Sequence, residues 1–335
     1  MSSGQVPNTL RVECIADDIR LVRDEDDLAE RIVHADRHKI PATIIGGGSN
    51  LVLRARLPGM AIVLKLRGAE FERLGDDDWR VAAAAGENWQ TVVDGALERG
   101  IGGLENLTLI PGSVGAAPVQ NIGAYGRELS EVLEWVTVFD RQELRYSTLT
   151  GAQCAFGYRD SVFKRDSLNR YVITRLALRL GRTAMVTDYP DVAREMAVHG
   201  GAVDCNTVAD AVARVRRRKL PDPARIGNVG SFFKNPVVSE AQLDGLRGLV
   251  DIDDYPAPAQ AVGRKIPAAR LIDAAGWKGV RKNRVQVWPR QPLVLVNLGG
   301  ATGAEVLDLA TSIRDDVYRR YGVALELEPA VLGAD

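Results

Sequence analysis

Apolar positions along the chain recur at two spacings, and together they predict a protein that mixes helices and strands. Leu28, Ile32 and Ala35 share one helical face after Asp24, a residue suited to cap a helix that ends near Lys39. Short apolar runs predict strands at 42–45, 51–53, 60–66, 79–85, 132–139 and 171–180, with a further helix at 89–99. The first half of the chain is therefore expected to be rich in β-structure.

The second half of the chain is expected to contain more helix. No clear strand lies between 181 and 206, a short helix is expected at 191–199, and a firmer helix should start at a cap, Asn206 or Thr207, and end at Lys219. The segment Leu220-Pro221-Asp222-Pro223 ends that helix and predicts a domain boundary. Further strands are expected at 230–234, 285–287, 293–297 and 325–332, and further helices at 240–247, 267–275 and 304–320.

Composition narrows the class of protein. The 335 residues are 46% hydrophobic and 26% charged, as is usual for a globular protein, and the net charge of -1 argues against a nucleic-acid binder. The N-terminus lacks an apolar leader, and no apolar run approaches the roughly 20 residues of a membrane span. We expect a cytoplasmic monomer that acts on a small molecule and has no membrane or nucleic-acid partner.

Cysteine and histidine give no signal for a disulfide or a metal. Cys14, Cys154 and Cys205 are odd in number and widely spaced, so neither a disulfide framework nor a metal knuckle is expected. His34 and His38 are four residues apart on the first expected helix, where the charged surroundings favour a solvated helical face over a metal site. No bound metal is therefore expected.

Two glycine-rich stretches suggest where a ligand binds. Residues 102–126, called the cradle here, contain six glycines among 25 residues and a single charged residue, Glu105, so they present backbone N–H groups that can hold an anion. Residues 46–50, called the glycine turn, begin with three glycines. Neither stretch reads G-x-G-x-x-G and the chain has no P-loop sequence, which disfavours a Rossmann or P-loop nucleotide site. A buried crossover between two sheets is the alternative interpretation of the cradle.

Five stretches carry a resemblance to a known family: IIGGGSNLVL, GLENLTLIPGSVGAAPVQNIGAYG, FGYRDSVFK, KLPDPARIGNVGSFFKNPVV and LELEPAVLG. They are scattered from residue 44 to residue 333, and the second and fourth are long enough to be highly specific. On these stretches the sequence resembles the UDP-N-acetylenolpyruvoylglucosamine reductases, flavoenzymes of bacterial cell-wall synthesis, in the class with a tyrosine-bearing loop. The resemblance thus implies a role in peptidoglycan synthesis and, with it, in cell shape and cell division.

The resemblance also implies a fold and a reaction. The fold is α+β, with an FAD-binding fold of the vanillyl-alcohol-oxidase type in two subdomains, residues 1–67 and 68–219, and a C-terminal α+β substrate-binding domain, residues 220–335. The activity is that of UDP-N-acetylmuramate dehydrogenase, an oxidoreductase that uses FAD and NADPH to reduce UDP-N-acetylglucosamine enolpyruvate to UDP-N-acetylmuramate. NADPH and the UDP-sugar would be used in turn at one site, which gives ping-pong kinetics.

Three residues match the family's catalytic positions. Hydride from flavin N5 must add to the enolpyruvyl group, and negative charge then builds on the neighbouring carbon and its carboxylate. Arg159 and Glu328 match the residues that stabilise this charge, and Ser231 matches the serine that gives a proton to the enolate. For Arg159, a surface ion pair with Asp160 is the alternative.

The remaining matches concern the two ligands. Cofactor contacts are implied for Gly46, Gly47, Gly48, Ser49, Asn50, Pro111, Gly112, Gly115, Ala116, Gln120, Asn121, Gly123, Ala124, Tyr125 and Tyr158. Contacts to the UDP-sugar are implied for Tyr189, Lys219, Asn235, Tyr255, Lys278 and Gln291, with Tyr189 on a loop that closes over the diphosphate. Lys219 ends a run of basic residues, so compensation of the helix dipole remains its alternative role.

Two rival functions stay open on the sequence alone. Another flavin oxidase or dehydrogenase would share the glycine-rich turns but should lack the GSFFKNP and KLPDP segments. A nucleotide-binding module without catalysis would need only the two glycine-rich stretches. A flavin spectrum that NADPH bleaches would separate an enzyme from such a module.

Overall fold

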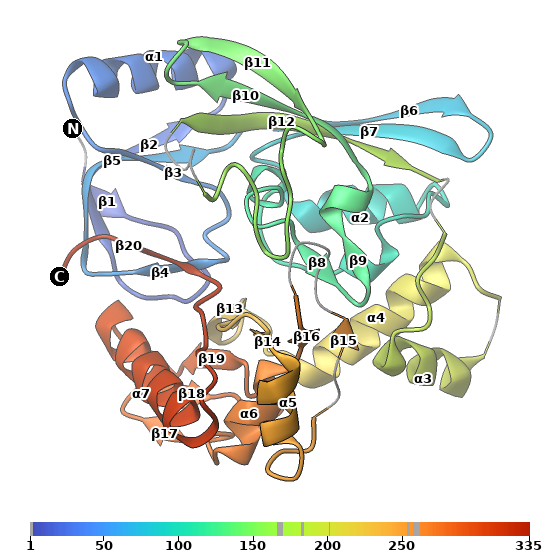
Figure 1. Cartoon of the computed structure of the whole chain (residues 1–335). Helices are drawn as coiled ribbons and strands as arrows, with labels where there is room; N and C mark the ends of the chain where they lie inside the picture. Colours follow the sequence, from blue (N-terminus) through green and yellow to red (C-terminus); the bar gives the residue numbers. More distant parts are fainter. Residues whose placement is uncertain (1–2, 166–169, 182–183, 201, 253–254, 257–261) are drawn as a thin grey trace. The chain divides into compact units, whose positions relative to one another are not determined.

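The computed structural model describes residues 3–165, 170–181, 184–200, 202–252, 255–256 and 262–335 (Figure 1). These residues form two compact units. The first comprises Asp18–Gly47 and Gly59–Arg218, and the second comprises Ser3–Asp17, Gly48–Pro58 and Lys219–Asp335. The chain therefore passes more than once between the units.

A five-stranded antiparallel sheet forms the centre of the first unit (Figure 1). Its strands follow in the order β11 (Arg145–Thr150), β10 (Leu133–Asp140), β12 (Tyr171–Leu180), β7 (Asp78–Ala84) and β6 (Ala69–Gly75). The strands predicted at 79–85, 132–139 and 171–180 are thus confirmed. One face of the sheet carries the core, where Val81, Val136, Leu176 and Leu178 are fully buried.

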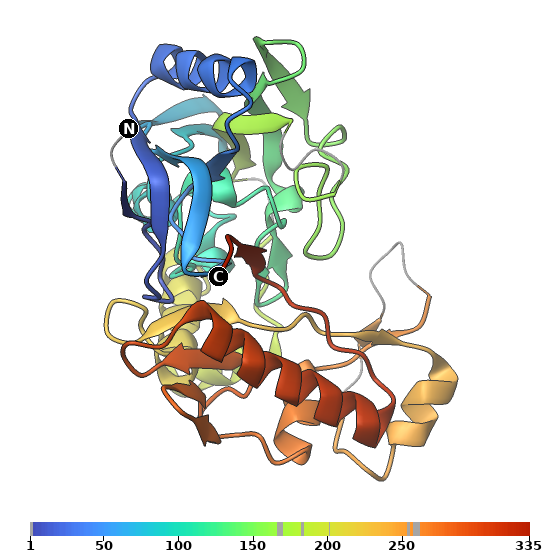
Figure 2. The ribbon, with the colours of Figure 1, turned by 90° about the vertical axis from the view of Figure 1, so that its left-hand side faces the viewer.

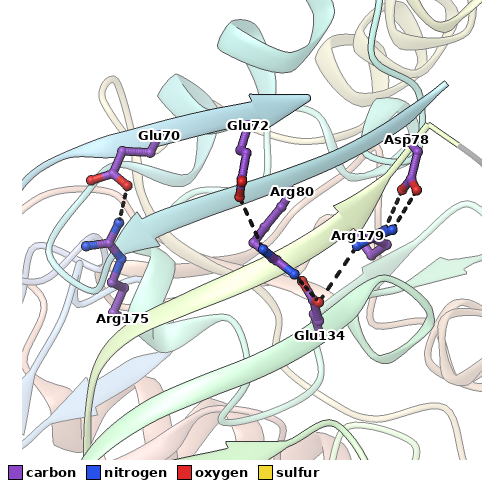
Figure 3. Close-up of polar contacts among 7 residues, drawn as sticks. All are labelled: Glu70, Glu72, Asp78, Arg80, Glu134, Arg175 and Arg179. Atoms are coloured by element: carbon purple, nitrogen blue, oxygen red, sulfur yellow. Dashed lines mark hydrogen bonds and ion pairs between the residues drawn. The ribbon is translucent and has the colours of Figure 1, made fainter. Parts of the chain in front are cut away.

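The opposite face of this sheet carries a ladder of ion pairs. Figure 3 shows its members: Glu70 and Glu72 (β6), Asp78 and Arg80 (β7), Glu134 (β10), and Arg175 and Arg179 (β12). Arg80 is central, because its Nε lies 2.7 Å from Glu134 Oε2 and its Nη1 lies 3.1 Å from Glu72 Oε2. The hydrogen bond from Arg80 lowers the pKa of the Glu134 carboxyl below its ordinary value. The ladder lets charged side chains cover a sheet face that would otherwise expose backbone and apolar surface.

Helix α1 (Glu25–Arg37) lies beside β10 and β11 in both views of the ribbon (Figures 1 and 2). The predicted cap is confirmed, since the Asp24 carboxylate accepts a hydrogen bond from the N–H of Asp27. The hydroxyl of Tyr146 on β11 donates to the carbonyl of Glu25, which fixes the start of the helix on the sheet. The apolar face predicted from the sequence is fully buried: it consists of Leu28, Ile32 and Ala35.

Strand β3 (Ala42–Ile45) pairs in parallel with β5 (Arg56–Leu64). The first unit also contains the helix α2 (Trp89–Leu97) and the short strands β8 (Gly123–Ala124) and β9 (Arg127–Glu128). Its 3-10 turns are η1 (Glu105–Leu107), η2 (Val114–Ala116) and η3 (Leu129–Glu131). The cradle is a chain of tight turns that contains η1, η2 and the start of the β8–β9 hairpin. Both interpretations of the cradle, a ligand site and a buried crossover between two sheets, stay predictions.

Helices α3 (Pro190–His199) and α4 (Cys205–Lys219) pack side by side (Figure 1). Glu195 of α3 accepts from Arg214 Nε at 3.0 Å and from Arg218 Nη1 at 2.8 Å. The helix predicted at 191–199 is confirmed, but the caps predicted for the next helix are wrong. Asp204 is the residue whose carboxylate accepts from the N–H of Thr207, so α4 begins two residues earlier than predicted, at Cys205.

The second unit contains a four-stranded antiparallel sheet and three helices. The strands follow in the order β13 (Gly227–Ser231), β19 (Val294–Asn297), β18 (Val285–Val287) and β17 (Arg281–Lys282). The helices are α5 (Glu240–Leu246), α6 (Ala268–Ala274) and α7 (Gly303–Tyr321), as predicted. Smaller strands are β1 (Gly4–Gln5), the start of β2 (Ile15–Val22), β4 (Leu51–Leu53), β14 (Val237–Val238), β15 (Tyr255–Pro256), β16 (Arg264–Lys265) and β20 (Ala330–Leu332).

Two strand predictions in this unit are wrong. The strand predicted at 230–234 lies at Gly227–Ser231, and the strand predicted at 325–332 is reduced to Ala330–Leu332. The apolar residues that suggested both strands instead make one isolated bridge, Phe233 to Leu327. The next hydrogen bond along the segment goes elsewhere, because the N–H of Ala330 donates to the carbonyl of Asn50.

Candidate active site

The glycine turn and the cradle meet backbone to backbone inside the first unit. The N–H of Gly47 donates to Ser113 Oγ at 3.1 Å. A Cβ atom on Gly47 would lie 2.8 Å from the Cα of Gly112, and a Cβ on Gly46 would strike Ser113 Oγ. Because neither approach leaves room for a side chain, glycine is required at 46 and 47 for the two turns to touch.

Gly115 has a different reason to be glycine. Its N–H donates to the carbonyl of Ala85 at 2.9 Å, and a Cβ atom here would lie 2.5 Å from the Ala85 Cβ. Ala85 directly follows β7, so at Gly115 the fold packs η2 against the sheet. The contact of Gly115 with a cofactor stays a prediction, but close packing of protein on protein is sufficient to explain the glycine.

Arg159 reaches the far end of the cradle. Its Nη2 donates to the carbonyl of Gly123 at 2.6 Å, and its Nη1 lies 3.5 Å from the carbonyl of Asn121. The alternative role, an ion pair with Asp160, stays a prediction: Asp160 pairs with Arg165, and Arg159 Nη1 lies 4.0 Å from Glu128 Oε1. Arg159 also stands over the ring of Tyr158, with 5.3 Å from the guanidinium carbon to the ring centroid. A half-buried cation is therefore fixed beside the cradle.

Tyr125 and Tyr189 also lie together in the first unit. Their rings meet edge to face, with centroids 5.3 Å apart. Tyr189 stands at the start of α3, and Tyr125 belongs to the cradle. Burial raises the pKa of the Tyr125 hydroxyl, so this tyrosine is neutral at physiological pH.

Ser231 and Glu328 are neighbours in the second unit. Ser231 ends β13, and the N–H of Glu328 donates to the carbonyl of the next residue, Phe232, at 3.0 Å. Asn50 of the glycine turn lies on the other side of this segment, because its Nδ2 donates to the carbonyl of Glu328 at 3.3 Å and its own carbonyl accepts from Ala330. Two of the three predicted catalytic residues are thus set side by side by backbone pairing.

A second set of predicted residues lies near the same strand. Ser231 pairs with Val294, whose backbone hydrogen-bonds to Trp288 and to Gln291 in the β18–β19 turn. Trp288 Nε1 donates to the carbonyl of Lys219 at 3.0 Å. Ser231, Gln291 and Lys219 therefore share one backbone framework. Gln291 Oε1 is buried and has no hydrogen-bond partner among the described residues, as expected of a group that waits for a ligand donor.

The other predicted substrate residues are placed less tightly. Asn235 Oδ1 accepts from the N–H of Ala268 at 3.0 Å and thereby helps to start α6. Lys278 is exposed, with its Nζ 2.9 Å from Asp273 Oδ2. The backbone of Tyr255 pairs with Lys265 in a short sheet, whereas its side chain lies outside the described residues.

Most of the predicted cofactor residues are accessible. Gly48, Gly115 and Asn121 are buried and Gly47 is exposed, whereas the rest are half-buried: Gly46, Ser49, Asn50, Pro111, Gly112, Ala116, Gln120, Gly123, Ala124, Tyr125 and Tyr158. The turn residues Gly46 and Gly47 belong to the first unit, and Gly48, Ser49 and Asn50 belong to the second. A partly open row of small residues and main chain suits a flat or phosphate-bearing cofactor.

Three residues that support this site were not predicted from the sequence. Ser113 Oγ accepts from the N–H of Gly47, Glu128 accepts from Asn121 Nδ2 at 2.7 Å, and Asn106 Nδ2 donates to the carbonyl of Tyr125. Each is a polar residue beside or within a matched motif, and only this nearness to a motif could have pointed to these residues in the sequence. The histidines fit their expected role as a helix face, and the described residues contain no group of three metal-ligating side chains.

Comparison with known proteins matches two parts of the chain to family models. Residues 17–143 match a family of FAD binding domains, and residues 222–332 match the C-terminal domain of UDP-N-acetylenolpyruvoylglucosamine reductase. The reductase of Burkholderia ambifaria strain MC40-6 is 46% identical over 316 residues, 90% of each chain. That of Cupriavidus pinatubonensis is 47% identical over 316 residues, 93% of this chain and 92% of the relative.

The chain belongs to the UDP-N-acetylenolpyruvoylglucosamine reductase family. The crystal structure of the reductase from Thermus caldophilus shares the fold, with a TM-score of 0.68 at 24% identity, covering 99% of this chain and all of the other. The predicted fold class is confirmed, and the chain is an FAD-containing oxidoreductase of peptidoglycan synthesis. FAD and NADPH are the cofactors that this family membership supports.

Membership of the reductase family also decides between the rival functions. A module without catalysis is inconsistent with relatives that are reductases along nine-tenths of the chain. No helix among the described residues is both long and apolar enough to cross a membrane. The domain boundaries at 67 and 219 stay predictions.

Proposed function

We propose that this enzyme reduces UDP-N-acetylglucosamine enolpyruvate to UDP-N-acetylmuramate with electrons from NADPH. The observation that carries the proposal is the near full-length match to the reductases at 46% identity, together with the pairing that sets Ser231 beside Glu328. The substrate is a small UDP-sugar. The monomeric state and the cytoplasmic location stay predictions from the sequence.

The glycine turn and the cradle would hold the cofactor in this proposal. Bound FAD supplies hydride transfer, from NADPH in one half of the cycle and to the enolpyruvyl carbon in the other. Gly47 and Gly112 provide main chain without side chains where the two turns touch, and Ser113 keeps them in register. These contacts fit a ligand bound by backbone rather than by charge.

Arg159, Glu328 and Ser231 would carry out the protein's part of the chemistry. Arg159 places a fixed positive charge where the carboxylate gains negative charge, and Glu328 stabilises the same charge as a hydrogen-bonding acid. Ser231 gives its hydroxyl proton to the carbon of the enolate. Arg159 is suited to its role because its guanidinium is already held by the carbonyls of the cradle and needs little reorganisation.

The UDP moiety would be bound by a separate group of side chains: Tyr189, Lys219, Asn235, Tyr255, Lys278 and Gln291. Support comes from Gln291, whose buried Oε1 has no partner among the described residues and is available to accept from a ligand N–H. The main chain of Lys219 is fixed, because its carbonyl accepts from Trp288 Nε1. NADPH and the UDP-sugar would bind in turn.

Ser231→Ala separates the two halves of the proposed cycle. Flavin reduction by NADPH needs no proton on carbon, whereas conversion of the enolpyruvyl sugar does. We therefore expect anaerobic stopped-flow absorbance to show normal reduction by NADPH and re-oxidation by the UDP-sugar slowed roughly 10²- to 10⁴-fold. Ser312→Ala, which removes a half-buried serine hydroxyl on α7, is the matched control. Re-oxidation at the unmodified rate, or equal loss of both halves, would make Ser231 a structural hydroxyl.

A further inference from the structure

Lys219 lies at a helix end whose carbonyl has no helical donor. It is the last residue of α4, and the last four carbonyls of an α-helix have no partner within the helix. In a continued helix the carbonyl of Lys219 would accept from the residue four positions on. That residue is Pro223, which has no N–H to donate. A donor from another part of the chain can therefore fix this carbonyl.

The indole of Trp288 supplies such a donor. Its Nε1 lies 3.0 Å from the Lys219 carbonyl, and both residues belong to the second unit. Asn228 holds the next part of the same segment, because its Nδ2 donates to the carbonyl of Pro221 at 3.2 Å. Asn228 lies in β13 and Trp288 directly follows β18, so one sheet holds the chain at Lys219 and at Pro221.

The main chain of Trp288 is fixed by the same sheet. Its N–H donates to the carbonyl of Val294 at 2.8 Å, and its carbonyl accepts from the N–H of Gln291 at 3.3 Å. Val294 pairs with Ser231 across β13 and β19. Trp288 thus connects three predicted site residues: Ser231 and Gln291 through its main chain, and Lys219 through its indole.

We propose that Trp288 is a positioning residue for the UDP-sugar, acting through the main chain of Lys219. The inference rests on the proposed function, in which Lys219 contacts the UDP moiety. A lysine has a flexible four-carbon stem, so its ammonium group loses less freedom on meeting a ligand anion when its main chain is already fixed. Without the indole donor, the ligand would have to supply that ordering free energy itself. The alternative is that Trp288 contributes to stability alone.

Trp288→Phe tests the proposal, because it removes the indole N–H and keeps an aromatic ring and the main-chain hydrogen bonds. Isothermal titration calorimetry of the oxidised holoenzyme with UDP-N-acetylglucosamine enolpyruvate should show Kd raised roughly 3- to 10-fold, the size of one neutral hydrogen bond. The limiting rate of flavin re-oxidation by this substrate should fall much less, because the reacting groups are untouched.

Trp277→Phe is the matched control. Trp277 is also a half-buried residue of the second unit, and its Nε1 donates to Asp316 Oδ2 at 2.9 Å. Both variants lose one indole hydrogen bond, so both should unfold at a lower urea concentration. Trp277→Phe should nevertheless leave Kd unchanged, which separates an effect on the ligand from an effect on stability.

A double-mutant cycle shows whether Trp288 acts through Lys219. In a Lys219→Ala background, Trp288→Phe should raise Kd by less than about twofold, since the ammonium group that it positions has gone. A residue that only stabilised the fold would not give a smaller effect in this background.

Three results would overturn the proposal. They are an unaltered Kd in Trp288→Phe, an equal rise of Kd in Trp277→Phe, and an undiminished effect of Trp288→Phe in the Lys219→Ala background. Failure of the proposed function gives a different result, because unmodified protein would then bind no enolpyruvyl UDP-sugar and its reduced flavin would not be re-oxidised by it.

Discussion

Gly115→Ala tests whether close packing of η2 on the sheet keeps position 115 glycine. The added Cβ would lie 2.5 Å from the Cβ, 3.0 Å from the Cα and 3.2 Å from the carbonyl oxygen of Ala85. Two carbon atoms rest at about 3.5 Å or more, so η2 would have to withdraw by about 1 Å. The hydrogen bond from the Gly115 N–H to the Ala85 carbonyl, now 2.9 Å, would then be lost.

The expected destabilisation combines two terms. Overpacking of a dense interior costs roughly 1–3 kcal/mol, and loss of a buried backbone hydrogen bond costs roughly 1 kcal/mol more. We therefore expect the free energy of unfolding to fall by about 2–4 kcal/mol, measured by urea denaturation followed by circular dichroism.

Gly102→Ala is the matched control in the same cradle. A Cβ atom there would meet its nearest neighbours, on Cys205 and Glu105, at 3.8 Å, which is an ordinary van der Waals contact. Its free energy of unfolding should stay within about 0.5 kcal/mol of the unmodified protein. Equal stability of the Gly115 and Gly102 variants would refute the packing argument.

The cofactor content of Gly115→Ala should fall together with stability. On sequence grounds alone, a side chain here would take space that FAD needs and give a folded, colourless protein. Because the Cβ points at Ala85, loss of colour should instead accompany loss of stability. Absorbance at the flavin band, measured beside the unfolding curve, separates the two explanations.

Two further predictions concern charged side chains. Lys219→Ala should raise KM for the UDP-sugar roughly 10- to 100-fold with a smaller change in kcat, and it should flatten the salt dependence of binding. Arg217→Ala is the control. An unaltered KM in Lys219→Ala would mean that Lys219 only compensates the dipole at the end of its helix. The carboxyl pKa of Glu134 is lowered by Arg80, so its stabilisation is present above the ordinary carboxyl pKa and is lost as pH falls through the lower folded value. Glu134→Gln should therefore cost about 0.2–1 kcal/mol near pH 7 in urea unfolding and progressively less as the pH falls below the ordinary carboxyl pKa, and a cost that does not change with pH would contradict the ion-pair explanation.

Helices and strands that are specified by the spacing of their own apolar residues were predictable from the sequence. Helix α7 was expected at 304–320 and spans Gly303–Tyr321, because Val306, Leu309, Ile313 and Val317 recur at helical spacing and all four are fully buried. Strand β12 has the predicted bounds for the analogous reason, since Leu176, Leu178 and Leu180 recur at strand spacing and all three are fully buried.

Strand β13 was misplaced because its signal is not local. Gly227 and Asn228 look unlike a strand, but they pair with Asn297 and Val296, and the N–H of Asn228 donates to Thr9 across more than two hundred residues. The apolar Phe232 and Phe233 look like a strand and lie beyond its end. Hydrophobic periodicity and strand propensity depend on neighbouring residues, so they cannot identify strand-pairing partners that are so distant in sequence.

The same limit applies to the site. The motifs located Arg159, Ser231 and the cradle, but the partners that hold them come from elsewhere in the chain. The partner of the Gly47 N–H is Ser113, and the partner of the Tyr125 carbonyl is Asn106. Each partner is a polar residue that a sequence also places on ordinary surfaces, so only the fold distinguishes it.

Backbone strain gives a reason for these partners to exist. Asn121, Tyr125 and Arg159 all have positive φ, at 45°, 50° and 53°, a region that non-glycine residues rarely adopt and that costs roughly 1–3 kcal/mol each. Such a conformation persists only where several contacts determine it. Side-chain contacts hold two of the three: Asn121 bonds to Glu128, to the carbonyl of Gly157 and to the N–H of Ser130, and Arg159 bonds to the carbonyls of the cradle.

At Tyr125 the task falls to Asn106, whose Nδ2 donates to the Tyr125 carbonyl at 2.9 Å. Asn106 also donates to the carbonyl of Val186, so one buried side chain holds both the strained main chain of Tyr125 and the segment that leads to Tyr189. Without that side chain, the positive φ of Tyr125 would lose its support, and the backbone would relax at the expense of the edge-to-face contact between Tyr125 and Tyr189.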